Sequence, residues 1–377
     1  MNDHPLISVV IPTRERAETL FHTLRTAVEQ DEQDCEILVC DNASRDRTRS
    51  LVESFTDPRL RYVNSGQRLP MSENWNFAMR HVQGRYVMII GDDDGVMPGG
   101  LTRLRLLIES RPAKIYFWQV SEYYWPIGDV PPVISHVAPL SPPRDVDLAP
   151  LARFAVRWGS WRYGSLPLGY HSAVARELLD AMLSRTGKVF HSTNPDVFMA
   201  FALPPLCGQA IDTGESYTVS GRSAKANSGA NMAADGQTVF QKFVDEYGDY
   251  RLHPTLHPGI PFKINMYGDS VLKAIDLFPD FYHNTPFNYS AMYAHAHRII
   301  GSLSVRETLA MRSEIQQRQP FSPARFLALC VLHELMELRV LLRRKVIRSR
   351  YTPSAADMPR DIYAMVHYLA HAQPRLS

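Results

Sequence analysis

The sequence predicts an α/β fold in its first half, followed by a mostly helical region. Over about the first 120 residues, short runs rich in β-branched and aromatic residues alternate with helical patterns, which is typical of a parallel sheet with crossover helices. From Gln237 onward, helical patterns punctuated by prolines replace this alternation. We therefore expect a sheet-containing domain over residues 1–235 and a helical region over residues 236–377.

The β-rich runs predict five strands, which are Ile7–Ile11, Glu36–Cys40, Arg61–Val63, Tyr86–Ile90 and Lys114–Trp118. Between the first two runs, Leu20, Leu24 and Val28 recur at helical spacing and mark one apolar face of a helix. Strand and helix thus alternate from the first element onward, as a crossover topology requires.

A second helix is expected to begin at Ser72, a common N-cap residue, and to stop at Gly84, which suits the left-handed position after a helix end. Its Trp75 is interpreted as a core residue, because aromatic residues on such helices are usually buried. The proline-rich stretch from Pro126 to Pro150 is expected to be a long loop of the kind that lines binding sites.

The composition narrows the class of protein without naming a partner. A chain of 377 residues that is 45% hydrophobic can bury a sizeable core. The 41 basic and 39 acidic residues leave a formal net charge of +2, which does not indicate a nucleic-acid partner. The N-terminus has no signal-peptide pattern, no apolar run of about 20 residues follows, and the cysteines show no CxxC spacing. We expect a cytoplasmic protein with reduced cysteines.

Polar residues gather directly after three of the expected strands. Pro12, Thr13, Arg14 and Glu15 follow the first strand, Asp41 closes the second, and the triplet Asp92, Asp93 and Asp94 follows the fourth. Open α/β sheets bind ligands in the crevice at the carboxyl ends of their strands, so these groups are expected to converge there. Taken alone, Asp41 could equally be a turn residue.

The aspartate triplet predicts a bound metal. Three successive carboxylates repel one another unless something cationic is bound between them. Mn²⁺ and Mg²⁺ prefer carboxylate oxygens and commonly share their remaining coordination sites with phosphate. We therefore expect a metal-bound diphosphate at the triplet. A solvated acidic turn is the alternative, and the apolar strand before the triplet argues against it.

At these residues the sequence resembles glycosyltransferase family 2, whose members have the GT-A fold and transfer sugars with inversion at the anomeric carbon. The resemblance is carried by the segments Ser8 to Arg16, Asp41 to Ser44 and Gly84 to Pro98. Many members have an acid where Gly91 stands, so the choice between Asp93 and Asp94 as the metal ligand stays open.

The resemblance implies specific roles for residues near the donor. It implies that Asp41 contacts the nucleotide base, that Asp92 contacts the ribose, and that the pyrophosphate lies between them and the metal. It also implies that Pro12, Thr13, Arg14 and Glu15 form the nucleotide loop and that Asn74 lies near the donor. The implied donor is a UDP- or dTDP-linked sugar. The implied acceptor is a glycan or a lipid-linked molecule in bacterial polysaccharide assembly.

The resemblance also places an acid at the stage of the chain where Asp196 stands, so we expect Asp196 to be the general base of an inverting transfer. The segment Ser192 to Met199 has the pattern of a helix start, with Pro195 in the first turn. An Asp at that position also stabilises a helix through the dipole, which is the structural alternative. Asp212 and Glu215 are the other candidate bases.

Further basic residues lie in the middle of the chain. His171 and His191 could each donate to a phosphate or hydroxyl, but a lone histidine is more often structural. Arg222 and Lys225 could neutralise a departing diphosphate, or could belong to a plain surface loop.

The segment from Pro323 to Arg350 predicts a helix whose second half is strongly basic. Six basic residues follow Glu337 without an opposing acid. Such a segment can lie on anionic lipid and bring an enzyme to the inner face of a membrane, or it can be a core helix with a solvated basic end. Within it, the sequence from His333 to Glu337 begins like a zincin motif, lacks the second histidine, and is interpreted as a helix face.

Competing functions are weighed on the same residues. A dinucleotide-binding domain would need GxGxxG after the first strand, where this chain has PTRER. A sugar-nucleotide or glycan-binding module without turnover is the alternative from another class, and the intact aspartate triplet argues against it.

Overall fold

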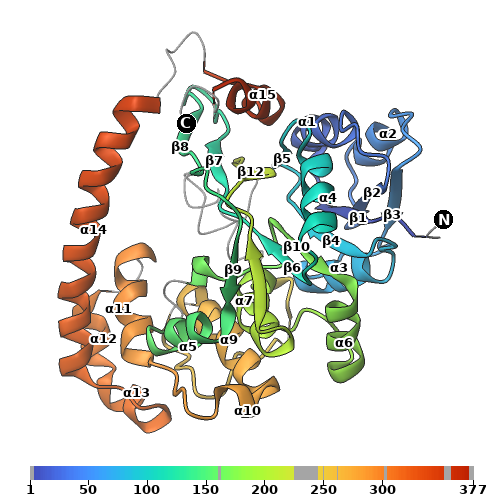
Figure 1. Ribbon diagram of the computed structural model, residues 1–377. Coiled ribbons are helices and arrows are strands. Elements are labelled where there is room, and N and C mark those ends of the chain that lie inside the picture. The colour runs from blue at the N-terminus through green and yellow to red at the C-terminus, as the bar shows by residue number, and fades with distance from the viewer. Residues whose placement is uncertain are drawn as a thin grey trace.

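The computed structural model describes residues 4–159, 163–224, 245–248, 250–260, 262–300, 304–351 and 358–372. Within them, an eight-stranded mixed sheet forms the centre, with the strand order β3-β2-β1-β4-β10-β6-β11-β9. The strand β3 lies toward one side of the molecule, and the long helix α14 lies at the other side (Figure 1).

The five predicted strands are confirmed to within two residues at each end. They are β1 (Ile7–Thr13), β2 (Cys35–Asp41), β3 (Leu60–Asn64), β4 (Tyr86–Ile89) and β6 (Ile115–Phe117). The first four are parallel neighbours, and β10 (Ser172–Ala175) then pairs antiparallel with both β4 and β6. Strands β1, β2 and β4 are largely buried because both faces of the sheet are covered, so their residues are mostly apolar rather than alternating, while β3 at the edge is partly exposed.

Helices cover both faces of the sheet. The first helix is confirmed as α1 (Ala17–Val28), and its Leu20 and Leu24 are fully buried. It packs with α4 (Gly100–Ser110) on one face, while α3 (Met71–Met79) and α7 (Pro195–Leu206) pack on the other. The remaining elements of this half are α2 (Thr48–Glu53), α5 (Leu148–Arg157), a 3₁₀ turn (Tyr163–Ser165), α6 (Arg176–Thr186) and β11 (Gln209–Asp212).

The prediction of a helix capped by Ser72 and stopped by Gly84 is wrong at both ends. The N-cap of α3 is Pro70 and the helix ends at Met79. The Ser72 hydroxyl instead lies 3.2 Å from the Tyr247 hydroxyl. Gly84 is required for a different reason, because a Cβ there would lie 2.5 Å from the backbone nitrogen of Ser8. It permits close approach to β1 and does not end a helix.

The stretch from Pro126 to Pro150 was predicted to be a long loop, and this prediction is wrong in part. It contains β8 (Val133–His136) and β9 (Arg144–Asp147), and α5 begins at Leu148. The strand β8 belongs to a second, four-stranded sheet with the order β5-β12-β7-β8, in which β5 is Gly95–Val96, β12 is Thr218–Arg222 and β7 is Ser121–Tyr124. Four-residue strands in which every residue is partly or fully exposed carry too little apolar pattern to be recognised.

The described residues after position 244 are mostly helical, as predicted. The helices are α9 (Phe262–Leu277), α10 (Pro279–Tyr282), α11 (Tyr289–Ile300), α12 (Val305–Ala310), α13 (Arg312–Arg318), α14 (Pro323–Tyr351) and α15 (Ile362–Ala372). The helix expected from Pro323 to Arg350 is confirmed as α14. The expected domain boundary after residue 235 lies outside the described residues.

The last described helix, α15, returns to the first half of the chain. Its Ile362, Met365, Val366 and Leu369 are buried against Tyr123 and Val219 of the second sheet, among others. The Tyr363 hydroxyl donates to Glu29 at the end of α1, 2.8 Å away. Figure 1 shows α15 beside α1 and β5, far along the chain from both. The helix α15 therefore packs against the sheet-containing half of the chain.

Candidate functional site

The aspartate triplet lies immediately after β4, where the polar ends of β1, β4 and β12 meet. Asp92 is buried, and its carboxylate accepts hydrogen bonds from the Thr13 hydroxyl at 2.7 Å and from Arg16 at 2.9 Å. The residues that follow β1 and the aspartate triplet that follows β4 therefore lie together, as predicted. Arg16 supplies the positive charge for Asp92.

Asp94 accepts hydrogen bonds from three groups and lies next to His171. Its two oxygens accept from the backbone N–H of Gly91 at 2.6 Å and of Gly221 at 2.7 Å, and the Tyr170 hydroxyl also donates to it. His171 Nε2 lies 3.2 Å from the same carboxylate. Burial acts to raise the pKa of Asp94, but His171, Tyr170 and Gly91 outweigh it and hold that pKa below its usual value. Both oxygens of Asp94 therefore have hydrogen-bond donors. These donors come from segments at β4, β10 and β12, which Asp94 links.

Asp93 is less well compensated than its neighbours. Its carboxylate accepts the backbone N–H of Ser223 at 2.9 Å, and its backbone carbonyl accepts the indole N–H of Trp125 at 3.0 Å. Burial, and next the charge of Asp94, raise the pKa of Asp93 to about 7, although Arg16 acts in the opposite direction. The positive charge of Arg16 does not offset the burial of Asp93 and the charge of Asp94, so Asp93 is the member of the triplet that an added cation would satisfy.

Gly221 passes so close to Asp93 that no side chain fits between them. A Cβ at this position would lie 1.8 Å from the carbonyl oxygen of Asp93. We expect Gly221→Ala to displace Asp93 and to lower the free energy of unfolding by about 1–3 kcal/mol, the usual cost of overpacking. Chemical denaturation measures this, with Gly208→Ala as the matched control, since nothing lies within 4 Å of a Cβ there. Equal stability of the two variants would contradict the packing described.

Asp41 lies at the end of β2, as predicted, but its carboxylate already has three donors. They are the hydroxyl of Tyr62 at 2.6 Å, the side-chain amide of Asn64 at 2.9 Å and the backbone N–H of Ser44 at 3.1 Å. Beside it opens a cleft of about 370 Å³, lined by Ala43, Ser44, Arg45, Asn64, Gly66, Gln67 and Arg68. Asp41 thus holds Ser44 and Asn64, which line this cleft.

The loop after β1 lies on the same side. The backbone N–H of Glu15 donates to Ser44 at 2.8 Å, and the Glu15 carboxylate accepts the backbone N–H of Arg45 at 3.0 Å. Arg14 forms an ion pair with Glu246 at 2.6 Å. Pro12 is paired with Cys40 within the sheet. These contacts hold the loop after β1 against the segment that follows Asp41.

Asn74 is buried in α3 and faces the sheet. Its side-chain oxygen accepts the thiol of Cys40 at 3.5 Å. Its expected position near the donor remains a prediction. Trp75 is buried, as expected, and stacks on Tyr170 with ring centroids 5.8 Å apart. Through Tyr170, the packing of α3 thus supports the position of Asp94.

Asp196 is the second residue of α7, as its pattern predicted. Burial raises the pKa of Asp196, and hydrogen bonds from the Val197 N–H and its own N–H offset this only in part. His171, which contacts Asp94, also acts on the pKa of Asp196, in the lowering direction. Among the described residues, Asp196 forms no ion pair. Asp196 and Asp94 thus both interact electrostatically with His171.

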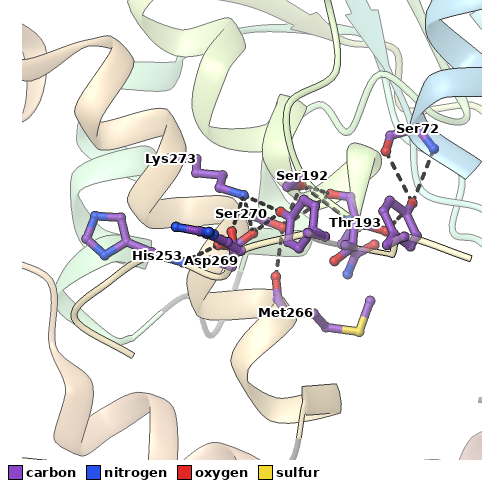
Figure 2. A network of polar contacts seen from close by, with 12 residues as sticks. Ser72, Ser192, Thr193, His253, Met266, Asp269, Ser270 and Lys273 are labelled. Carbon is purple, nitrogen blue, oxygen red and sulfur yellow. Dashed lines mark hydrogen bonds and ion pairs between the residues drawn. The ribbon is translucent and has the colours of Figure 1, made fainter. Parts of the chain in front are cut away.

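The loop that leads into α7 is fixed from two sides (Figure 2). The Ser270 hydroxyl on α9 donates to the Ser192 hydroxyl at 2.9 Å, and the Tyr247 hydroxyl donates to the Thr193 carbonyl at 3.4 Å. On α9 the buried Asp269 is paired with Lys273 at 3.1 Å. The helical region therefore helps to set the position of Asp196.

The other candidate residues have structural partners. Asp212 pairs with Arg144 at 2.8 Å, and Glu215 pairs with Arg103. His191 lies 2.8 Å from the Thr186 hydroxyl. Arg222 pairs with Glu122 at 2.9 Å on the neighbouring strand. Lys225 lies outside the described residues. His333 is buried on α14, consistent with its interpretation as part of a helix face.

Three contributors to the site have no signal in the sequence. Tyr170, Trp125 and Gly221 come from segments that approach the triplet only in the folded chain. Each is an ordinary residue type in an unremarkable local pattern. The histidine at position 171 was noticed, but its contact with Asp94 was not foreseeable.

Part of the chain matches a known protein family. Residues 8–162 match the model of glycosyl transferase family 2. This segment contains the residues that line the cleft beside Asp41 and the whole aspartate triplet. Part of the chain therefore matches glycosyl transferase family 2, as the sequence resemblance implied.

Characterised relatives agree with this assignment over a limited length. The chain is 32% identical over 103 residues to the GalNAc(5)-diNAcBac-PP-undecaprenol beta-1,3-glucosyltransferase of Campylobacter jejuni, covering 26% of this chain and 33% of that protein. It is 28% identical over 94 residues to the UDP-Glc:alpha-D-GlcNAc-diphosphoundecaprenol beta-1,3-glucosyltransferase WfgD of Escherichia coli, covering 25% and 37% respectively. The chain thus spans about a third of the length of each of these relatives.

A solved structure supports the fold over most of the chain. Residues 1–349 of S. aureus TarS, in complex with UDP-GlcNAc, match with a TM-score of 0.50 at 12% sequence identity, covering 88% of this chain and 92% of that one. At this identity the likeness concerns the fold alone. It confirms the predicted GT-A-type α/β fold with a helical C-terminal region.

Proposed function

We propose that this protein is an inverting, metal-dependent glycosyltransferase that moves a sugar from a nucleoside-diphosphate sugar to an acceptor hydroxyl. The observation that carries the proposal is the convergence of the aspartate triplet with Thr13 and Arg16 at the ends of β4 and β1. Inversion needs one group that takes the acceptor proton on the face opposite the leaving group. Asp196 supplies that group, and the cleft beside Asp41 supplies room for the nucleotide.

The residues around Asp93 fit a divalent cation. Among the residues described, no cluster of three or more His, Cys, Asp or Glu could hold a metal alone. Mg²⁺ is commonly bound by one or two carboxylates together with substrate phosphates and water, so a single well-placed carboxylate is sufficient. Asp93 has the uncompensated charge for this role. Mn²⁺ or Mg²⁺ bound there would neutralise charge on the departing diphosphate.

We favour Asp93 over Asp94 as the residue that holds the metal. Both oxygens of Asp94 are occupied by backbone and side-chain donors, which would have to be given up before a cation could bind. On Asp93, the described residues provide one hydrogen bond to one carboxylate oxygen. Arg16 and Thr13 keep Asp92 in place for a ribose hydroxyl to donate to it.

The donor and acceptor are proposed from the relatives. TarS was solved with UDP-GlcNAc, and WfgD is named for UDP-Glc and a diphosphoundecaprenol acceptor. We propose a UDP- or dTDP-linked donor and a glycan or lipid-linked acceptor in bacterial polysaccharide assembly, reached at the cytoplasmic side of the membrane. No helix among the residues that the structure describes is long and apolar enough to cross a membrane.

A thermal-shift series tests the proposal. UDP, dTDP and GDP are added with and without Mn²⁺, because a ligand that binds the native state raises the melting temperature. We expect UDP or dTDP to raise it by several degrees only when metal is present. The absence of any nucleotide-dependent shift would contradict the proposal. Nucleotide binding without donor hydrolysis or transfer would instead favour a binding module that lacks turnover.

A further inference from the structure

The long helix α14 exposes an apolar stripe on the side that faces away from the rest of the molecule. Leu327, Val331, Leu335 and Leu338 are between 43% and 61% exposed. Their spacing of four, four and three residues places them along one face of the helix. The stripe, which we call the outer stripe, extends about 16 Å at a rise of 1.5 Å per residue.

The opposite face of α14 already has a partner within the chain. Phe326 and His333 are buried, and α14 packs along α11. The rings of His295 and His333 lie with centroids 5.5 Å apart at this contact. The inner face therefore accounts for the stability of the helix, and the outer stripe is not needed to hold α14 in place. The helix thus has a packed face and an exposed apolar face. The core role and the membrane role considered from the sequence therefore concern different faces of α14.

The charge next to the stripe indicates what covers it. After Glu337 the helix continues to Tyr351 with six basic residues and no acid, namely Arg339, Arg343, Arg344, Lys345, Arg348 and Arg350. A second copy of this chain aligned in parallel would bring twelve positive charges together. An anionic lipid surface offers an apolar interior for the stripe and negative headgroups for the basic half.

We propose that the outer stripe of α14 docks the protein on an anionic lipid surface. The helix lies in the plane of the interface, with the four apolar side chains entering the boundary between headgroups and acyl chains. The basic half adds electrostatic attraction, which salt screens. The position of α14 at one edge of the molecule leaves the strands β1 to β4 clear of the surface (Figure 1). This inference does not depend on the catalytic proposal, because lipid binding is measured without turnover.

Vesicle flotation of the whole protein tests it. We expect the protein to float with phosphatidylcholine vesicles that contain phosphatidylglycerol at low salt, and much less with phosphatidylcholine alone. The double variant Val331→Glu/Leu335→Glu should lower binding about tenfold or more, because it removes apolar area and adds negative charge. A second variant, Arg343→Glu/Arg344→Glu, should lose the preference for anionic vesicles.

The control variant changes equally exposed leucines elsewhere. Leu106→Glu/Leu183→Glu replaces side chains that are 51% and 41% exposed on α4 and α6, and it should float as the wild type does. Circular dichroism of each variant confirms folding. Equal flotation of the Val331→Glu/Leu335→Glu protein would overturn the proposal. The proposal would also be overturned if the wild-type protein bound no lipid and were a dimer, and if the Val331→Glu/Leu335→Glu variant were a monomer. The stripe would then pack against a second copy of the chain.

Discussion

Asp196→Asn should reduce sugar transfer about 100-fold or more while leaving the affinity for the donor nearly unchanged. The substitution keeps the size of the side chain and its place in the first turn of α7, but it removes the group that accepts the acceptor proton. Steady-state kinetics with a defined acceptor measure the effect, and nucleotide-induced thermal shifts report donor binding. The loss should therefore appear in kcat, with the thermal shift retained.

The matched controls are Asp212→Asn and Glu215→Gln. Both carboxylates are engaged by arginines, at Arg144 and Arg103, and should tolerate the change with transfer reduced less than about threefold. Near-normal turnover of a folded Asp196→Asn protein would remove Asp196 from the mechanism. A large loss in Glu215→Gln alone would transfer the role of base to Glu215.

The pH dependence of transfer gives a second measurement on the same residue. A general base acts only when deprotonated, and burial raises the pKa of Asp196 above that of an ordinary aspartate. We expect kcat/KM to fall as the pH decreases through this raised pKa, at a higher pH than an exposed carboxylate would require. In the Asp196→Asn protein, the residual activity should not show this acidic limb.

Removal of metal should abolish transfer, and Asp93 should be the residue through which metal acts. EDTA is expected to eliminate activity, and Mn²⁺ or Mg²⁺ to restore it. Asp93→Asn should remove the metal-dependent part of the UDP thermal shift, because Asp93 provides the uncompensated carboxylate. Isothermal titration of UDP with and without Mn²⁺ measures the loss. Full activity in chelator would exclude the metal from the mechanism.

The two neighbouring aspartates are distinguished by stability in EDTA. In the metal-free protein the raised pKa of Asp93 means that the folded state binds a proton more tightly than the unfolded state does. The contribution of Asp93 to the stability of the folded state therefore becomes more unfavourable as the pH rises toward 7. Asp93→Asn should raise the melting temperature at neutral pH. The pKa of Asp94 is lowered, so its charge stabilises the fold, and Asp94→Asn should reduce the melting temperature. The opposite pattern would assign the metal to Asp94.

Much of the fold was predictable because the parallel strands are buried on both faces. Strands β1 and β2 have continuous apolar runs, and the polar residues that end them mark the edge of the sheet. The positions of Asp41 and Asp92 followed from this alone. The start of α7 at Pro195 also followed from a local signal, since proline favours the first helical turn.

The remaining features depend on contacts between distant segments. Ser72 has the residue type of an N-cap, yet Tyr247 engages its hydroxyl and a proline precedes the helix. Gly84 has the residue type of a helix end, yet its role is close contact with Ser8. The saturation of Asp94 by Tyr170 and Gly221 likewise has no local pattern. In each case the tertiary contact outweighs the local preference on which the prediction was based.

The return of α15 to the sheet affects the order in which the protein can be completed during translation. The helix buries Tyr123 and Val219, and it packs in the same apolar cluster as Trp125, whose indole holds the Asp93 carbonyl. A ribosome adds about 5–20 residues per second, with N-terminal parts generally folding first. The strands that carry the triplet therefore leave the ribosome well before the helix that supports Trp125. A nascent chain that has not reached Leu369 should present an open apolar surface to chaperones and should not yet retain a nucleotide sugar.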